Sequence, residues 1–194
     1  MVPDANTFFW VGNHPGLDLT NTEAVDARGE RLELVTDCSA LVEWAELAGL
    51  IDADLRRRCR AAPVRQQRIV LAWFRRLRSA LRGVLEPSEE ASPADVAEAF
   101  DAAVAAVPVR LSYDPGRDRL PLDAPGPLEQ LRLTLACAAL DATRLDRSRV
   151  HRCESDRCVL LFYDTTRNRS RRWCDMAVCG NRAKARAHYH RTKR

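Results

Sequence analysis

Four cysteines lie close together near the carboxyl end of this 194-residue chain. Cys153 and Cys158 form a Cys-x4-Cys pair, and Cys174 and Cys179 form a second such pair after an insert of fifteen residues. Each pair closes a small loop and the insert folds back across the metal, as a tetrahedral four-cysteine zinc site requires. Because four thiolates leave no coordination position open for water, the spacing predicts one structural Zn²⁺ ion.

The spacing of the second pair constrains the backbone between its two cysteines. Five residues of α-helix turn by about 500°, which leaves the side chains of Cys174 and Cys179 about 140° apart. We therefore expect Cys174 to precede a helix, or the segment between the cysteines to be irregular. His151, His188 and His190 are also ligands by residue type, but four cysteines already complete a tetrahedral shell.

The residues around the cysteines predict a hairpin followed by a helix. Residues 150–153 and the apolar, β-rich run 159–163 are typical of strands. Residues 164–170 form a polar loop, and a basic helix is expected over about 181–190. A hairpin that supplies one ligand pair and a helix start that supplies the other together predict a treble-clef-like zinc finger.

Charge is distributed unevenly along the chain. Residues 149–194 contain 13 Lys and Arg against 4 Asp and Glu, a net charge of +9, whereas the remaining residues carry −5. This asymmetry predicts an anionic partner for the basic module, and nucleic acid is the partner we expect. A solvated basic tail that serves solubility is the alternative.

Cations of this module would follow a duplex backbone and would bind it less tightly as the salt concentration rises. Arg182 and Arg186 are i, i+4 neighbours on the expected helix. Asn181 and Arg182 each fit two roles. They can reach base edges, or Asn181 can cap the helix while Arg182 pairs with Asp164 or Asp175 to support the finger. The candidate DNA-contacting residues are Arg167, Arg169, Arg171, Arg172, Asn181, Arg182, Lys184 and Arg186.

The residues before the cysteines predict a mostly helical body. Apolar residues recur at every third or fourth position, and helices are expected over residues 39–48, 63–85, 93–107 and 127–145. A hairpin is expected from strands at 109–113 and 119–122, in which Pro121 places the second strand at an edge. Residues 13–16 predict a turn, followed by the short segment 17–22.

These elements together predict the fold class and the domain organisation. The fold class is mainly α with a small β-hairpin or sheet (α+β). A helical domain of residues 1–148, for sensing or dimerisation, precedes the zinc finger of residues 149–194, and the boundary lies near 146–149. The three scattered cysteines, Cys38, Cys59 and Cys137, are expected to be buried thiols without a special role.

Residues 153–186 resemble the CGNR zinc-finger family. The matching pieces are the two cysteine pairs and residues 161–164 (LFYD), 166–168 (TRN), 170–174 (SRRWC) and 179–184 (CGNRAK). Residues 17–22 (LDLTNT) and 41–50 (LVEWAELAGL) are similar to the ABATE domain that usually precedes this finger, although residues 12–17 (GNHPGL) depart from its more usual Gly-Gly and apolar pattern. The resemblance implies a bacterial, stress-induced transcription regulator whose finger binds zinc and double-stranded DNA.

These residues are compatible with three functions. The leading one is a DNA-binding regulator, in which His14, Asp18 and Asn21 line a pocket for a small-molecule effector. Turn and cap duties explain the same three side chains equally well. The second is an RNA-binding or protein-interaction module in which aromatic residues of the finger stack on unpaired bases. The third, an enzyme, is disfavoured because no nucleophile–base pair, phosphate-binding loop or open metal site stands out.

The expected location and assembly follow from the same sequence. The chain has no run of about 18 apolar residues, so we expect no membrane-spanning helix. The first 13 residues lack the basic start and apolar core of a signal peptide. We therefore expect a cytoplasmic protein at the nucleoid. A twofold dimer fits a single small finger of limited DNA specificity.

Overall fold

The computed structural model describes residues 8–26, 28–86, 92–111 and 122–192, which form two compact units. The central unit is Val35–Thr143, and the terminal unit combines the described residues of Met1–Leu34 and Arg144–Arg194. The units divide after Thr143, close to the boundary that was expected near residues 146–149. The terminal unit also contains a segment from the beginning of the chain, which joins the cysteine-rich module in one compact body.

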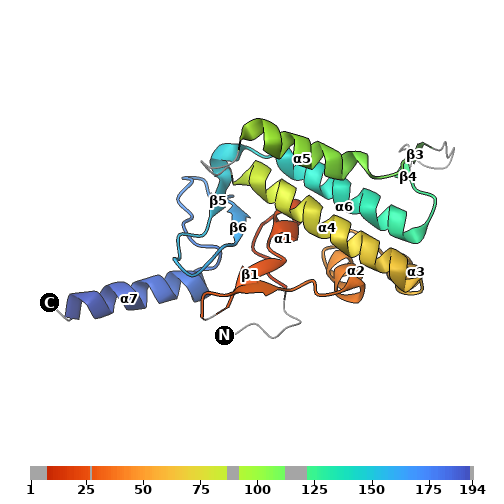
Figure 1. Ribbon diagram of the computed structural model, residues 1–194. Helices are drawn as coiled ribbons and strands as arrows, with labels where there is room; N and C mark the ends of the chain where they lie inside the picture. Colours follow the sequence, from red (N-terminus) through yellow and green to blue (C-terminus); the bar gives the residue numbers. More distant parts are fainter. Residues whose placement is uncertain (1–7, 27, 87–91, 112–121, 193–194) are drawn as a thin grey trace. The chain divides into compact units, whose positions relative to one another are not determined.

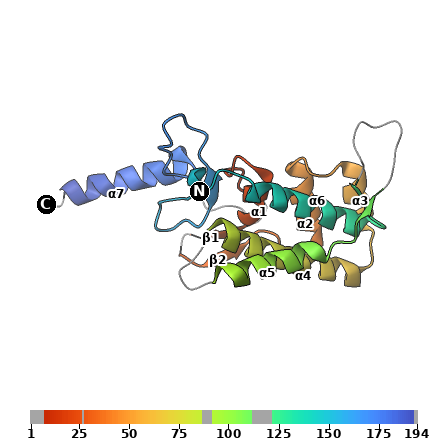
Figure 2. The same ribbon diagram turned by 90° about the horizontal axis from the view of Figure 1, so that it is seen from above.

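The central unit is helical. Its helices are α2 (Cys38–Leu47), α3 (Ala53–Arg60), α4 (Val64–Leu85), α5 (Pro93–Ala105) and α6 (Pro127–Thr143). The long helix α4 lies beside both α5 and α6 (Figures 1 and 2). The short strands β3 (Arg110–Leu111) and β4 (Leu122–Asp123) pair in antiparallel fashion.

Apolar stripes of α4 and its neighbours form the core of the central unit. Trp73, Phe74 and Leu77 of α4 are fully buried, as are Trp44 of α2 and Leu135 of α6. Burial of side chains of this size stabilises the fold by roughly 1.5–3 kcal/mol each. The regular 3.6-residue period therefore decides which face of each helix turns inward.

The expected helices are confirmed with small shifts at their ends. Asp37 accepts a hydrogen bond from Ala40 N at 2.8 Å, so α2 begins one residue earlier than expected, at Cys38. Helix α3 was not expected: Asp52 caps it, but it buries only Leu55 and Cys59, which is too few apolar residues to reveal a period. The fold class, mainly α with small antiparallel sheets, is confirmed.

The expected hairpin and the three scattered cysteines also lie in the central unit. The pairing of β3 with β4 confirms the hairpin, while its turn and Pro121 lie outside the described residues. Cys38 and Cys59 are buried, and burial raises the pKa of these thiols to about 11 and about 12. The expectation for Cys137 was wrong, because it lies on a solvent-facing position of α6 and is exposed.

The terminal unit is built from short elements. From the first part of the chain it takes α1 (Pro15–Thr20), β1 (Glu23–Val25) and β2 (Arg31–Glu33). From the last part it takes the 3-10 turn η1 (Arg147–Arg149), β5 (Val150–Arg152), β6 (Leu161–Tyr163), the π-helical turn η2 (Met176–Gly180) and α7 (Asn181–Thr192). The ladders β1–β2 and β5–β6 are antiparallel pairs, and α7 leads away from β5 and β6 (Figure 1).

Candidate metal centre and basic helix

The first cysteine pair lies in the loop of the β5–β6 hairpin. His151 is paired with Phe162 across the ladder, and beyond it Cys153 N donates to Leu160 O at 3.0 Å. Within the loop, Cys158 N donates to Ser155 O at 2.9 Å. These backbone hydrogen bonds fold the four residues between the cysteines into a tight turn, which brings both thiols to the same side of the hairpin.

Cys174 precedes the irregular segment that the spacing of the second pair predicts, and Cys179 lies within it. Asp175 caps the segment by accepting from Val178 N at 2.7 Å, and the N–H groups of Cys179 and Gly180 both donate to Asp175 O. This π-helical turn inserts an extra residue into the helix start, so Cys179 comes round to the side of Cys174. The expected break in helical geometry is confirmed.

Gly180 lies against two side chains at this turn. A β-carbon at this position would lie 3.1 Å from Cδ1 of Trp173 and would overlap Met176 Sδ. The side chains of Trp173 and Met176 therefore cover the backbone directly next to Cys179. A larger residue at 180 would have to displace the flexible, half-exposed side chain of Met176 and press against Trp173.

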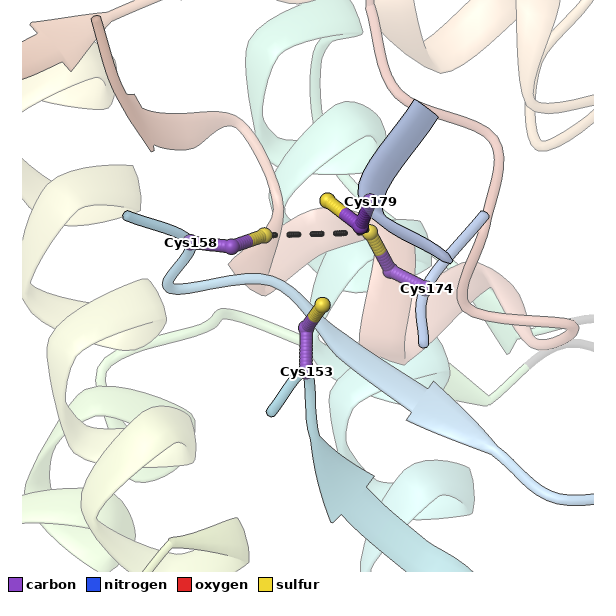
Figure 3. A group of neighbouring side chains, drawn as sticks. All are labelled: Cys153, Cys158, Cys174 and Cys179. Atoms are coloured by element: carbon purple, nitrogen blue, oxygen red, sulfur yellow. Dashed lines mark hydrogen bonds between the residues drawn. The ribbon is translucent and has the colours of Figure 1, made fainter. Parts of the chain in front are cut away.

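The four sulfurs converge on one point (Figure 3). All lie within 4.8 Å of one another, and the Cys158–Cys174 and Cys174–Cys179 sulfur distances are 3.7 and 3.6 Å. Sulfurs at about 2.3 Å from a tetrahedral Zn²⁺ lie about 3.8 Å apart, so the donor set and its size fit this ion. The side chains are all buried, and one structural zinc ion is the cofactor of this site.

The four thiols lie so close together that they change one another's pKa values. Hydrogen bonds from Cys158 and Cys174 lower the pKa of Cys153, whereas the hydrogen bond to Cys153 raises the pKa of Cys158. Several thiolates in one buried cluster repel each other, and a divalent cation offsets that repulsion. His151 and His188 do not belong to the group of ligand atoms found among the described residues.

A buried carboxylate fixes the loop between the two ligand pairs. Asp164 accepts hydrogen bonds from the hydroxyl and the N–H of Thr166, at 2.6 and 2.8 Å, and from Arg171 N at 2.9 Å. Burial raises the pKa of Asp164, but the hydrogen bonds from Thr166 and Arg171 outweigh it and lower that pKa to about 2. Arg149 closes the loop by donating to the carbonyl groups of Asp164 and Thr166.

Arg171 supports the zinc finger from within the terminal unit. Its guanidinium lies 4.3 Å from the ring centroid of Phe162 and donates to the carbonyl groups of Cys174, Trp173 and Val11. These contacts join the second ligand pair, the hairpin and the N-terminal segment. The supporting role considered for Arg182 thus lies with Arg171, and among the described residues Arg182 makes no ion pair with Asp164 or Asp175.

The N-terminal segment binds the free edge of β6 through an asparagine. Nδ2 of Asn21 donates to Leu161 O, and Oδ1 of Asn21 accepts from Leu161 N, both at 2.8 Å. The carboxamide thus copies the hydrogen-bond pattern of a neighbouring strand. Tyr163 N donates to Gly12 O at 2.9 Å, and Asn13 donates to Tyr163 O at 3.0 Å, which extends this contact.

The three residues considered for an effector pocket all make structural contacts here. Asp18 accepts from the N–H groups of Val11 and Gly12, and His14 caps α1 by accepting from Gly16 N at 3.0 Å. Burial raises the pKa of Asp18, although its hydrogen bonds oppose that shift. Sequence reasoning missed that His14, Asp18 and Asn21 belong to the zinc finger's own unit. The contact of Asn21 with Leu161 spans 140 residues of sequence, and no local pattern indicates it.

The expected DNA-contacting residues divide by environment. Arg169 contacts Asp146 and Ser148, Arg172 forms an ion pair with Glu154 at 2.5 Å, and Arg186 forms one with Asp156. Asn181 donates to Ala177 O at 3.1 Å and so supports the π-helical turn. Of the expected DNA-contacting cations, Arg167, Arg182 and Lys184 are exposed and have no described ion pair.

Phe162 is unavailable for base stacking because it is fully buried beneath Arg171. Trp173 is half-buried, with the guanidinium of Arg172 5.2 Å from its ring centroid. Both rings therefore belong mainly to the small core of the finger.

Two family models match the chain. The ABATE model, described as "Putative stress-induced transcription regulator", matches residues 13–148. The CGNR zinc finger model matches residues 149–192. A search of curated protein sequences gives no significant match. Among the described residues, no helix is both long enough and apolar enough to cross a membrane.

Proposed function

The chain belongs to the ABATE family and carries a CGNR zinc finger, and from this membership we propose that it is a transcription regulator that binds double-stranded DNA through α7. The zinc ion would organise the start of that helix without taking part in chemistry. Four thiolates would fill the coordination shell, so the proposal assigns binding and no catalysis to the site.

The character of α7 is the single observation that carries this proposal. Its twelve residues contain Arg182, Lys184, Arg186 and Arg191 and no acidic residue. Its described side chains are exposed, apart from the half-buried Ala183, and its main contact is with η2. A helix with no apolar stripe gains little from packing within its own unit. Its length of about 18 Å and its diameter suit the major groove of DNA.

The two sides of α7 differ in their surroundings. Arg182 and Arg186 lie about 40° apart around the helix axis, and Lys184 and Arg191 lie about 20° apart on the opposite side. Arg182 and Arg186 line a hollow with Asp156 of the hairpin loop, where Asp156 pairs with Arg186. The outer face, defined here as Lys184, His188 and Arg191, has no acid near it in sequence or in the described ion pairs. We assign the phosphate contacts to this outer face.

The experiment compares equal losses of charge at three places in the full-length, zinc-loaded protein. The double variant Lys184→Gln/Arg191→Gln removes the Lys and Arg charges of the outer face, and Arg182→Gln/Arg186→Gln removes the inner pair. A control, Arg65→Gln/Arg68→Gln, removes two exposed cations of α4 in the central unit. Binding to a labelled mixed-sequence duplex is followed by fluorescence anisotropy from 20 to 200 mM salt, chosen to span roughly a decade in ion concentration.

The outer-face variant should weaken binding about tenfold or more, and the slope of log K against log salt should fall by about 2, because each lost phosphate contact contributes about 0.9. The inner pair should change both quantities less, and the α4 control should change neither. Failure of the wild-type protein to bind any duplex at low salt would contradict the proposed function. An equal loss in the inner and outer variants would contradict the assignment of the face.

RNA binding on the same scaffold is tested in the same assay. Burial of Phe162 removes one of the rings that stacking on unpaired bases would need, and this supports duplex DNA as the partner. Tighter binding of single-stranded RNA than of duplex DNA would instead favour the RNA-binding function.

We propose that the central unit senses a small molecule, and that two copies form a twofold dimer on DNA, because one finger buries too little surface for high specificity. A regulator of this kind would act in the cytoplasm at the nucleoid. Mass measurement in solution with and without duplex tests the dimer directly.

A further inference from the structure

A groove runs between α4 and α5 on the surface of the central unit. Its volume is about 570 Å³, within the range that small-molecule sites occupy. Its walls include Trp73, Arg76 and Gly83 from α4, Asp95 and Ala99 from α5, and Ala106 directly after α5. Most of the lining side chains are small and apolar, so the space between the two helices is left open.

The two ends of the groove carry opposite charges. Trp73 Nε1 donates to Ala103 O at 2.8 Å, while a β-carbon on Gly83 would lie 3.3 Å from Cγ1 of Val96. These contacts show that α4 and α5 run antiparallel. Arg76 therefore lies at the Trp73 end of the groove, and Asp95 lies at the Gly83 end. Along the axis of α4, Arg76 and Gly83 are about 10 Å apart.

A second cation adds to the positive end. The Arg132 guanidinium lies 4.9 Å from the ring centroid of Trp73 and donates to Ala106 O at 2.5 Å, and both of those residues line the groove. Among the described residues, Nε of Arg132 is buried without a hydrogen-bond partner. Burial lowers the pKa of Arg132; Glu129 opposes that shift and Arg76 adds to it, so Arg76 and Arg132 are close enough to repel each other.

We propose that the α4–α5 groove binds an elongated apolar small molecule whose anionic group lies at the Arg76 end. An anion there would relieve the repulsion between two guanidinium groups, and charge-assisted hydrogen bonds would fix its orientation. The indole of Trp73 and the alanine-lined walls would take the apolar part. Asp95 at the far end would disfavour the reversed orientation.

The proposal assigns the ligand site to the central unit and does not rest on DNA binding. His14, Asp18 and Asn21 make hydrogen bonds inside the terminal unit, whereas the α4–α5 groove is a separate hollow for a small ligand in the central unit. Binding of a probe without DNA present tests the groove separately from the proposed regulator.

The test uses two fluorescent probes that differ by one charged group. 8-Anilinonaphthalene-1-sulfonate is an apolar anion, and N-phenyl-1-naphthylamine is the same hydrocarbon framework without the sulfonate. Each is titrated into the full-length, zinc-loaded protein and into four variants. Arg76→Gln removes the positive end, Asp95→Asn removes the negative end, Ala99→Leu fills the groove, and Arg68→Gln is a control on an exposed position of α4 outside the groove.

The sulfonate probe should bind at one site per chain and more tightly than the neutral probe. Arg76→Gln should weaken the sulfonate probe about tenfold and leave the neutral probe unchanged. Asp95→Asn should strengthen the sulfonate probe or leave it unchanged, Ala99→Leu should weaken both probes, and Arg68→Gln should affect neither. The proposal is overturned if Ala99→Leu leaves sulfonate binding intact, or if Arg76→Gln and Arg68→Gln have the same effect on it.

Discussion

The two units of this chain are stabilised in different ways. In the central unit, Trp73, Phe74 and Leu77 of one long helix are buried against neighbouring helices, and the hydrophobic effect supplies most of the stability. In the terminal unit, elements of three to twelve residues surround four thiols, and buried polar side chains such as Asn21 and Asp164 bond to backbone groups. The first unit is stable through helix packing, whereas the second depends on its metal and on a few polar contacts.

Loss of a zinc ligand should reveal the difference between the two units most clearly, because only the terminal unit should unfold. Cys153→Ser should abolish zinc binding and unfold the terminal unit, because structural zinc contributes on the order of 10 kcal/mol to such modules. The helices of the central unit should persist. Metal analysis and far-ultraviolet circular dichroism measure both effects. Cys137→Ser is the matched control, since this exposed cysteine lies in α6, and it should retain about one zinc per chain.

A cavity in the core of the central unit should have the opposite effect: it should destabilise the central unit and leave zinc binding intact. Leu77→Ala removes a fully buried side chain of α4 and should lower the free energy of unfolding of the central unit by about 2–5 kcal/mol. The zinc content should not change. Urea unfolding followed by the fluorescence of the core tryptophans measures the loss. A fall in zinc stoichiometry in this variant would show that the two units do not fold independently.

Asn21→Ala tests whether the N-terminal segment belongs to the zinc-dependent unit. The variant leaves the N–H and carbonyl of Leu161 without their partner and should destabilise the terminal unit by roughly 2–3 kcal/mol. Asn13→Gly removes an exposed hydrogen bond to Tyr163 at a position whose φ of 58° glycine tolerates, and it should cost less than 1 kcal/mol. Thermal unfolding in excess zinc compares them. Equal effects would argue against the buried asparagine contact.

The smallest expected effect is a pH dependence at Asp18. A carboxyl whose pKa is raised in the folded state stabilises the fold most below its unfolded value of 3.8, and this contribution is lost as the pH rises through the folded-state pKa. Asp18→Asn retains an acceptor for Gly12 N without the charge. Its stability relative to wild type should therefore rise between pH 4 and pH 7. A difference that stays constant over this range would contradict the raised pKa.

The sequence predicted what depends on local spacing. Apolar residues at every third or fourth position placed α4 to within one residue, and two cysteine pairs with a short insert placed the zinc site. The five-residue step from Cys174 to Cys179 predicted an irregular helix start, which is the π-helical turn. These features follow from geometry over a few residues, so a single sequence is enough to infer them.

The sequence did not predict what depends on distant contacts. Nothing near Asn21 indicates that its side chain bonds to Leu161, because the two residues meet only in the folded chain. The same holds for Arg171, which has the residue type of a phosphate contact but lies against Phe162. Helix α3 was missed for another reason: its two buried residues are too few to reveal a period.

Hydrogen exchange on the full-length protein, with zinc and after its removal by a chelator, tests the dependence of the terminal unit on metal most directly. Zinc removal should expose the amides of Gly12, Leu161 and Tyr163, which donate to Asp18, Asn21 and Gly12 in the folded unit. The amides in the middle of α4 should keep their protection. Retained protection at Gly12 and Leu161 without zinc would contradict the account.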